Sequence, residues 1–215
     1  MTLLKKIGRH PLAFSLAFFA VFLLGFLCVE LFVKTPVVYV YSPLDDLIPF
    51  WKYAIIFYAL WFPWIPVTLL YLLLKAPRRE LWQTILPLYA GMALCIVTYI
   101  VIPNGQQLRP ETIEGTDLFA TVVRLMQGMD PPMNVCPSLH VLVTVHLCLA
   151  WVRTRTPLVE RHPQIRAASV LLALSIIAAT VLLKQHSVID VFCGIAVALV
   201  LDFILGRTLV DRVCV

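Results

Sequence analysis

The sequence predicts an all-α membrane protein, a six-transmembrane-helix bundle with both termini in the cytosol. Three observations support this class: the composition, the number of long apolar runs, and the distribution of basic residues. Of the 215 residues, 61% are hydrophobic and only 13% are charged, whereas soluble domains carry about 25% charged residues. We therefore expect residues 1–215 to form a single membrane domain.

Six apolar runs approach the roughly 20 residues that a helix needs to cross a bilayer. The expected spans are Leu12–Val33, Phe50–Leu74, Leu81–Ile102, Cys136–Trp151, Ile165–Leu183 and Val188–Leu205. Basic residues precede the first run, as they do in a signal peptide. Its apolar part is too long for one and no small-residue cleavage site follows, so we expect it to be retained as a span.

The basic residues predict the orientation, because cytosolic loops of membrane proteins are enriched in Lys and Arg. Of 17 Lys and Arg residues, only five fall on one side of the predicted topology. They are Lys34, Lys52, Arg109, Arg124 and Lys184. The rule places this side outside, in a multi-pass protein of the cell membrane. The formal charge of +5 then reflects short loops between spans, which argues against a nucleic-acid partner.

The six cysteines do not form a disulfide or metal framework, because four lie inside apolar runs and no CxxC occurs. We expect them to be packing residues, and we expect no metal or other cofactor.

The loop from Pro103 to Val135 is long for a helical bundle, and such loops are often functional. Within it, Leu118, Val122, Leu125 and Met126 recur at helical spacing. This pattern predicts a short helix over 116–129 on the membrane surface. It would cover a site, guide a lipid, or simply connect two spans.

A polar loop ends in the sequence Cys-Pro-Ser-Leu-His at 136–140, which opens the fourth apolar run. Proline is favoured in the first turn of a helix, so Ser138 and His140 are expected in that turn. Free backbone N–H groups at a helix N-terminus bind phosphate readily. This stretch is therefore a candidate phosphate site.

Two further polar stretches lie at predicted outer ends of spans. His186 and Asp190 are one helical turn apart, so the carboxylate can orient the imidazole. Arg109 follows the third span, and Lys184 lies just before His186. Phosphoryl transfer needs a nucleophile, an acid for the leaving group and cationic donors. Two histidines, a carboxylate and two cations at the same membrane face fit that list.

Each of these residues also has an ordinary structural interpretation. A histidine at a span end is usually interfacial, and Arg109 alone would bind lipid head groups. A carboxylate such as Asp190 inside an apolar run is more indicative, because charge in a membrane is costly. His146, in mid-span, is interpreted as a buried, hydrogen-bonded histidine.

These motifs make the chain similar to the type 2 phosphatidic acid phosphatase superfamily, the lipid phosphate phosphatases. Its signatures are KxxxxxxRP, PSGH and SRxxxxxHxxxD. The first matches only at Arg109-Pro110, the second matches at 137–140 with Leu139 in place of Gly, and the third matches through His186 and Asp190. The lysine of the first signature is replaced by Ile102, and the Ser-Arg pair of the third by residues 179–180. The resemblance extends over nearly the whole chain, because the signatures fall at the ends of the third, fourth and sixth spans.

The resemblance implies that His186 forms a phosphohistidine, that His140 is the general acid and that Asp190 supports His186. Arg109 and Ser138 would bind phosphate, and no metal would be needed. We infer that Lys184 replaces the missing arginine, because it lies four residues after Thr180 and would share its helix face. For the missing lysine, the polar residues Asn104, Gln106 and Gln107 are candidates.

The predicted function is an integral membrane enzyme that hydrolyses a lipid phosphate or pyrophosphate at the outer face. Leu139 and the Lys-Gln-His run at 184–186 also resemble lipid phosphotransferases such as inositol-phosphorylceramide synthases. A catalytically inactive lipid-binding or transport protein is the third alternative, because two cations are missing. The expected partners are a lipid phosphate and the bilayer. The identity of the lipid and the oligomeric state are left open.

Overall fold

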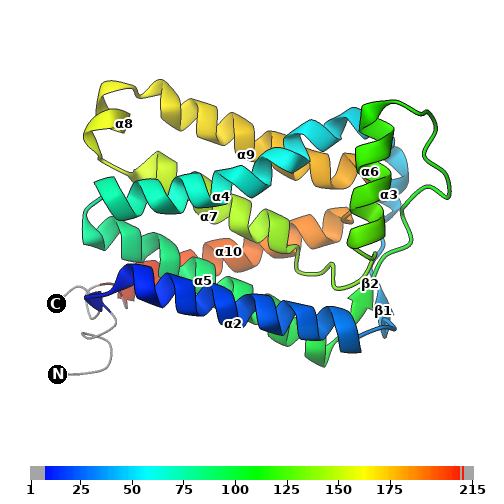
Figure 1. Cartoon of the computed structure of the whole chain (residues 1–215), viewed down its shortest axis with the longest axis horizontal. Coiled ribbons are helices and arrows are strands. Elements are labelled where there is room, and N and C mark those ends of the chain that lie inside the picture. Colours follow the sequence, from blue (N-terminus) through cyan, green and yellow to red (C-terminus); the bar gives the residue numbers. More distant parts are fainter. Residues whose placement is uncertain (1–7, 209, 211–215) are drawn as a thin grey trace.

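The computed structural model describes residues 8–208 and residue 210, and it is built almost entirely of helices (Figure 1). The α-helices are α2 (Pro11–Phe32), α3 (Pro43–Leu47), α4 (Ile55–Lys75), α5 (Arg78–Val101), α6 (Leu118–Met129), α7 (Leu139–Arg153), α8 (Pro157–Arg161), α9 (Gln164–Leu182) and α10 (Val188–Thr208). A 3-10 turn, η1 (Lys52–Ala54), precedes α4. Two short parallel strands, β1 (Val38–Tyr39) and β2 (Asn104–Gly105), pair near the ends of α2 and α5.

Five helices in the described part of the chain are long and apolar enough to cross a membrane. They are Pro11–Phe32, Lys52–Lys75, Arg78–Val101, Gln164–Leu182 and Val188–Gly206. The prediction of an all-helical protein is confirmed, and so is the prediction of several helices that are long and apolar enough to cross a membrane. Five of the six expected spans correspond to these helices.

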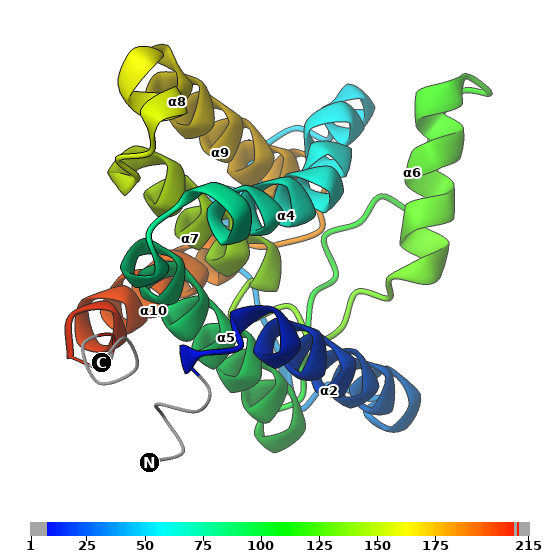
Figure 2. The same ribbon diagram turned by 60° about the vertical axis from the view of Figure 1, so that its left-hand side comes forward.

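The expected fourth span is shorter than predicted. α7 has 15 residues and is therefore about 22 Å long at 1.5 Å per residue, against about 30 Å for the hydrocarbon core. It is nevertheless the central helix, because it packs against α4, α5, α9 and α10 (Figure 2). A helix enclosed by protein on all these sides does not need the full apolar length of a lipid-exposed span.

Two glycines allow α7 to lie close to its neighbours. A Cβ at Gly91 of α5 would lie 2.8 Å from the side chain of Leu142, and a Cβ at Gly194 of α10 would lie 2.8 Å from the backbone oxygen of Ser138. Small residues at helix contacts are typical of membrane proteins, because they let backbones approach. Here they bring α10, which follows His186, against the start of α7.

α2 lies at the edge of the bundle and packs on α5. The contact is aromatic, with the rings of Phe18 and Tyr89 stacked at a centroid distance of 4.1 Å. Most of its other apolar side chains are exposed, among them Leu16, Leu23 and Leu24. This is the pattern of a helix that faces lipid rather than water.

The short helix predicted over 116–129 is present as α6, and it stands apart from the long helices (Figure 2). Its position on the membrane surface stays a prediction. The Asp117 side chain caps it by accepting hydrogen bonds from the backbone N–H groups of Phe119 and Ala120. Leu118, Leu125 and Met129 leave an apolar face exposed. α6, α3 and the strands share one end of the bundle, while α8 and the end of α10 lie at the other (Figure 1).

The basic residues Lys5, Lys6 and Arg212, which contribute to the predicted orientation, lie outside the described residues. The placement of both termini in the cytosol therefore stays a prediction.

Candidate active site

The three polar stretches meet at the end of the bundle that carries α6. Arg109, His140 and His186 line one cavity of about 40 Å³, which is room for a few water molecules. The other lining residues are Phe26, Tyr99, Asp130, Pro131, Met133, Asn134, Val135, Leu139 and Gln185. Arg109, His140 and His186, which are far apart in the sequence, are thus brought to one place, as the predicted topology required.

The two histidines face each other across this cavity. His186 Nε2 lies 3.4 Å from His140 Nδ1, and the ring centroids are 5.6 Å apart. His140 lies in the first turn of α7, whereas His186 lies between α9 and α10. The other nitrogen of His140, Nε2, is 2.8 Å from the hydroxyl of Tyr58 on α4. The indole N–H of Trp61 donates to the backbone oxygen of His140 at 3.2 Å.

Asp190 lies behind His186 on its opposite side. Its Oδ2 is 3.5 Å from His186 Nδ1 and also accepts the backbone N–H of Ser187 at 2.8 Å. Ser187 Oγ in turn accepts the N–H of Ile189, so the side chains of Ser187 and Asp190 both cap the start of α10. Asp190 is fully buried. It therefore both caps the helix and stands next to the imidazole.

One set of proton positions satisfies this chain of contacts. Tyr58 O–H donates to His140 Nε2, His140 Nδ1–H points to His186 Nε2, and His186 Nδ1–H points to Asp190. The last two separations, 3.4 and 3.5 Å, are longer than well-formed hydrogen bonds. This tautomer leaves a lone pair on His186 Nε2, as a nucleophile requires. A general acid at His140 needs the imidazolium form, in which Nε2–H donates to the Tyr58 hydroxyl.

Arg109 supplies the positive charge of the cavity. Its guanidinium donates to Gln185 Oε1 at 2.6 Å and to the backbone oxygen of Gln127 at 3.2 Å. Its buried Nε has no partner among the described residues. Burial lowers the pKa of Arg109, and the nearby carboxylate of Asp130 opposes that shift. The arginine still carries its charge, because its ordinary pKa is so high.

Ser138 lies at the N-cap of α7, and the helix begins at Leu139 rather than at Pro137. The expectation that the proline occupies the first turn is therefore wrong, whereas His140 does lie in that turn. Ser138 Oγ accepts the N–H of Val141 at 3.2 Å, and its own N–H donates to the backbone oxygen of Asp190 at 3.2 Å. Ser138 thus holds α7 and α10 together, and its role toward phosphate stays a prediction.

The expectation that Thr180 and Lys184 share a helix face is wrong. α9 ends at Leu182, and Lys184 has a left-handed backbone with φ of 55°. Its ammonium donates to the backbone oxygen of Asp45 at 2.5 Å, and it does not line the cavity. The amide N–H groups of Gln185 and His186 close the turn onto the carbonyl of Thr180.

The polar residues considered for the missing lysine are structural. Asn104 Oδ1 accepts the N–H groups of Val135 and Cys136, and its amide donates to the carbonyl of Cys136. Gln106 donates to the carbonyl of Lys184 at 2.8 Å. Both side chains are buried and hold the loops around the cavity, and Gln107 is exposed.

Sequence reasoning missed three residues that shape the site: Tyr58, Asp45 and Asp130. Tyr58 gave a signal, because a tyrosine hydroxyl inside an apolar span needs a partner. Asp45 accepts the N–H of Val188 at 2.8 Å and the hydroxyl of Ser187 at 2.6 Å, and so fixes the start of α10 from a distant loop. Nothing in the sequence near Asp45 or Asp130 indicated that these two residues contribute to the site.

A larger apolar groove, of about 380 Å³, opens beside the cavity between α2, α4, α6 and α7. It is lined by Phe22, Leu23, Phe26, Glu30, Tyr58, Trp61, Phe62, Met126, Met129, Asp130, Leu139 and His140. Phe26, Asp130, Leu139 and His140 line the cavity as well. The two spaces therefore lie next to each other, and the catalytic candidate His140 lies in the wall of both.

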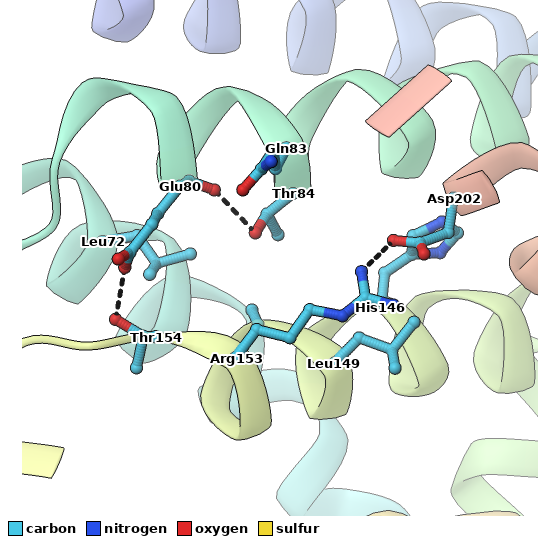
Figure 3. A pocket seen from close by; sticks show the side chains of 10 residues that line it. Leu72, Glu80, Gln83, Thr84, His146, Leu149, Arg153, Thr154 and Asp202 are labelled. Carbon is cyan, nitrogen blue, oxygen red and sulfur yellow. Dashed lines mark hydrogen bonds and ion pairs between the residues drawn. The ribbon is translucent and has the colours of Figure 1, made fainter. Parts of the chain in front are cut away.

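A second polar cavity lies at the other end of the bundle (Figure 3). His146 lines it, with Nδ1 bonded to the backbone oxygen of Leu142 at 2.9 Å, as expected for a buried histidine. The cation there, Arg153, is paired with Asp202 at 2.6 Å (Figure 3). No second histidine lines this cavity among the described residues, so it lacks the paired arrangement seen around His140 and His186.

No family model, no curated protein and no solved structure matches the chain. Within residues 8–208, no group of three or more His, Cys, Asp or Glu side chains could hold a metal ion. The chemical capability of the site therefore has to be judged from its own geometry.

Proposed function

We propose that the chain is an integral membrane lipid phosphatase, which hydrolyses a lipid phosphate or pyrophosphate at the outer face of the cell membrane through a phosphohistidine on His186. One observation supports this most strongly: the facing pair His140–His186, with Asp190 behind the latter and Arg109 in the same cavity. A nucleophile, an acid and a cation thus meet beside an apolar groove.

The reaction would proceed in two steps. His186 Nε2 attacks phosphorus, the bond from phosphorus to the lipid oxygen breaks, and the imidazolium form of His140 gives its Nδ1 proton to that oxygen and becomes neutral. Neutral His140 then takes a proton from water as the water oxygen attacks phosphorus. The bond from phosphorus to His186 Nε2 breaks, phosphate is released, and His140 is again an imidazolium. Asp190 stabilises the charge that His186 gains, and Arg109 stabilises charge on the transferring phosphoryl oxygens.

The free state cannot be the reacting state, because 3.4 Å between the two nitrogens leaves no space for a phosphoryl group in line between them. Substrate would replace the contact between the rings. Tyr58 holds His140 Nε2 at 2.8 Å, so His186, at the start of α10, is the side chain that we expect to move.

The apolar groove supports a lipid as the substrate. It is about 380 Å³ in volume, it is lined mainly by Phe, Leu, Met and Trp side chains, and it ends at His140. A lipid chain in the groove would place its phosphate in the cavity. The proposal includes six spans with both termini cytosolic, in which the short helix α7 is the fourth span and α6 lies on the outer surface of the bilayer.

The test is trapping of the phosphoenzyme with radiolabelled substrates, from a panel of phosphatidic acid, phosphatidylglycerophosphate and a polyprenyl pyrophosphate. His186→Ala should abolish an acid-labile, base-stable label, and His140→Ala should slow phosphate release from natural lipids by at least 10²-fold. His162→Ala, an exposed histidine far from the cavity, is the matched control. A metal chelator should leave the rate unchanged. Turnover that persists in His186→Ala would refute the mechanism.

A lipid phosphotransferase is the second candidate. Leu139, which replaces the glycine of the family signature, lines both the cavity and the groove. It thus adds apolar surface where the chain of an acceptor lipid would lie. Product analysis with and without an acceptor alcohol separates the two activities. A protein that never forms a phosphoenzyme with any substrate of the panel would instead be the inactive lipid-binding or transport protein.

A further inference from the structure

Asp130 occupies a position that a simple phosphate site does not explain. It follows α6 directly as its C-cap residue, and it lines both the cavity and the groove. It lies close enough to Arg109 and His186 to interact with both electrostatically. A negative charge at this point repels a phosphate bound between Arg109 and the histidines.

A second carboxylate faces the same place. Glu30, near the end of α2, lines the groove, and Asp130 acts on it electrostatically. No hydrogen bond or ion pair from a basic side chain to the Asp130 carboxylate is found in the described part of the chain. Arg109 donates instead to Gln185 and to the carbonyl of Gln127. Asp130 thus leaves negative charge between cavity and groove, and Glu30, whose charge Lys34 offsets in part, lies in the wall of the groove nearby.

The positions of the cavity and the groove indicate which part of a bound lipid would lie next to this negative charge. With phosphate in the cavity and the chain in the groove, the carbon atoms beside the phosphoester pass Asp130. A positive charge on those atoms would offset the negative charge of Asp130. Tyr58 and Trp61 also line the groove there, and aromatic faces add attraction for an ammonium group.

We propose that Asp130, assisted by Glu30, selects a lipid phosphate that carries an ammonium group on the carbon backbone next to its phosphoester. This inference rests on the proposed function, because it places the phosphate at His186 and Arg109. It adds the class of substrate: an amino-bearing lipid phosphate is bound in preference to one without the amine.

The experiment uses two phosphonates that cannot be cleaved, nonylphosphonate and 3-aminononylphosphonate, which differ only in the amine. Binding to the purified full chain in dodecyl maltoside is measured by isothermal titration calorimetry. The wild type should bind the amino compound about tenfold more tightly. Asp130→Asn should reduce this ratio to about one to three, and Glu30→Gln should reduce it less.

Glu111→Gln is the matched control, because it removes one exposed carboxylate of the predicted outer side that lines neither space. It should keep the wild-type ratio. A wild-type ratio near one, or an unchanged ratio in Asp130→Asn, would overturn the inference. If Asp130→Asn binds neither compound, Asp130→Glu decides: a ratio within threefold of wild type supports the inference, and a larger fall overturns it.

The binding ratio does not depend on turnover. Phosphate release from nonyl phosphate, which can be cleaved, is measured on the same preparation and tests the proposed function separately. If no phosphate is released but the preference for the amino compound is preserved, the phosphatase proposal is refuted and the ammonium site is supported. If phosphate is released but the two phosphonates bind equally, the ammonium site is refuted and the phosphatase proposal is supported.

Discussion

Gly194 lies at the closest approach of α10 and α7, and replacing it with alanine tests whether this contact positions the two histidines. A Cβ there would lie 2.8 Å from the backbone oxygen of Ser138 and 3.1 Å from Cβ of Val141. Ordinary contact begins at 3.4 Å, so the two helices would have to separate by roughly 0.6 Å. Ser138 is two residues before His140, and Gly194 is one turn after Asp190. Separation of the two helices should therefore change the distance between His140 and His186 directly.

The expected cost of Gly194→Ala is about 1–3 kcal/mol in the free energy of unfolding, the usual cost of overpacking a core. The obstacle is a backbone atom, which cannot rotate away. Catalytic geometry is more sensitive still, because a displacement near 1 Å can lower a rate by about 10²-fold. We expect at least a tenfold loss of phosphate release.

Two other glycines provide the comparison. A Cβ at Gly91 would lie 2.8 Å from the end of the Leu142 side chain, which can adopt another rotamer, so Gly91→Ala should cost less than Gly194→Ala. A Cβ at Gly128 of α6 meets nothing within 4 Å, and alanine there should be neutral or gain up to about 1 kcal/mol of helix propensity. Stability is measured by reversible unfolding in mixed dodecyl maltoside–SDS micelles. If the three variants are equally stable, or Gly194→Ala is as active as wild type, the reasoning is refuted.

Three further predictions concern Lys184, Asp130 and the sidedness of the loop after α5. Because the Lys184 ammonium donates to the carbonyl of Asp45, Lys184→Ala should lower the free energy of unfolding by about 1 kcal/mol and change kcat by less than threefold. A fall in kcat of about 10²-fold or more in steady-state assays would show instead that Lys184 reaches the phosphoryl group. Burial raises the pKa of the Asp130 carboxyl above its usual 3.8, so the folded state binds a proton at Asp130 more tightly than the unfolded state does. The free energy of unfolding therefore rises as the pH falls through the raised pKa, and this stabilisation is lost at higher pH. Asp130→Asn should therefore raise the melting temperature at pH 7 and flatten its dependence between pH 4 and 7, which thermal scans would show; a lower melting temperature at pH 7 contradicts the burial argument. A cysteine at Thr112, which is exposed, should react with a membrane-impermeant maleimide in intact cells, and labelling only after permeabilisation would reverse the proposed topology.

The sequence by itself determined the helical class and most of the helices, because apolar runs and their length are local properties. It also determined which polar stretches share one end of the bundle. Each of Arg109, His140 and His186 lies at the end of a predicted span, and alternating spans return the chain to the same side. The helical spacing of α6 and its apolar face were likewise readable from a dozen residues.

Only the tertiary structure decided what each polar group contacts. Lys184 appeared to share a face with Thr180, but the helix ends two residues before it and the left-handed turn directs the ammonium to Asp45. The side chain of Ser138 caps α7, and its backbone N–H donates to the carbonyl of Asp190 in α10. Such contacts depend on where a helix stops and on residues more than 100 positions away, which no local pattern encodes.

The length of α7 and the position of Asp130 show the same division. An apolar run of 16 residues predicts a span, yet burial of α7 among four other helices is a property of the whole bundle. Asp130 appeared to be one of several acidic loop residues. The packing of α2, α4 and α7 around the end of α6 places it in the wall of both cavity and groove, because side chains from distant segments, and not its neighbours in sequence, form the walls of both spaces.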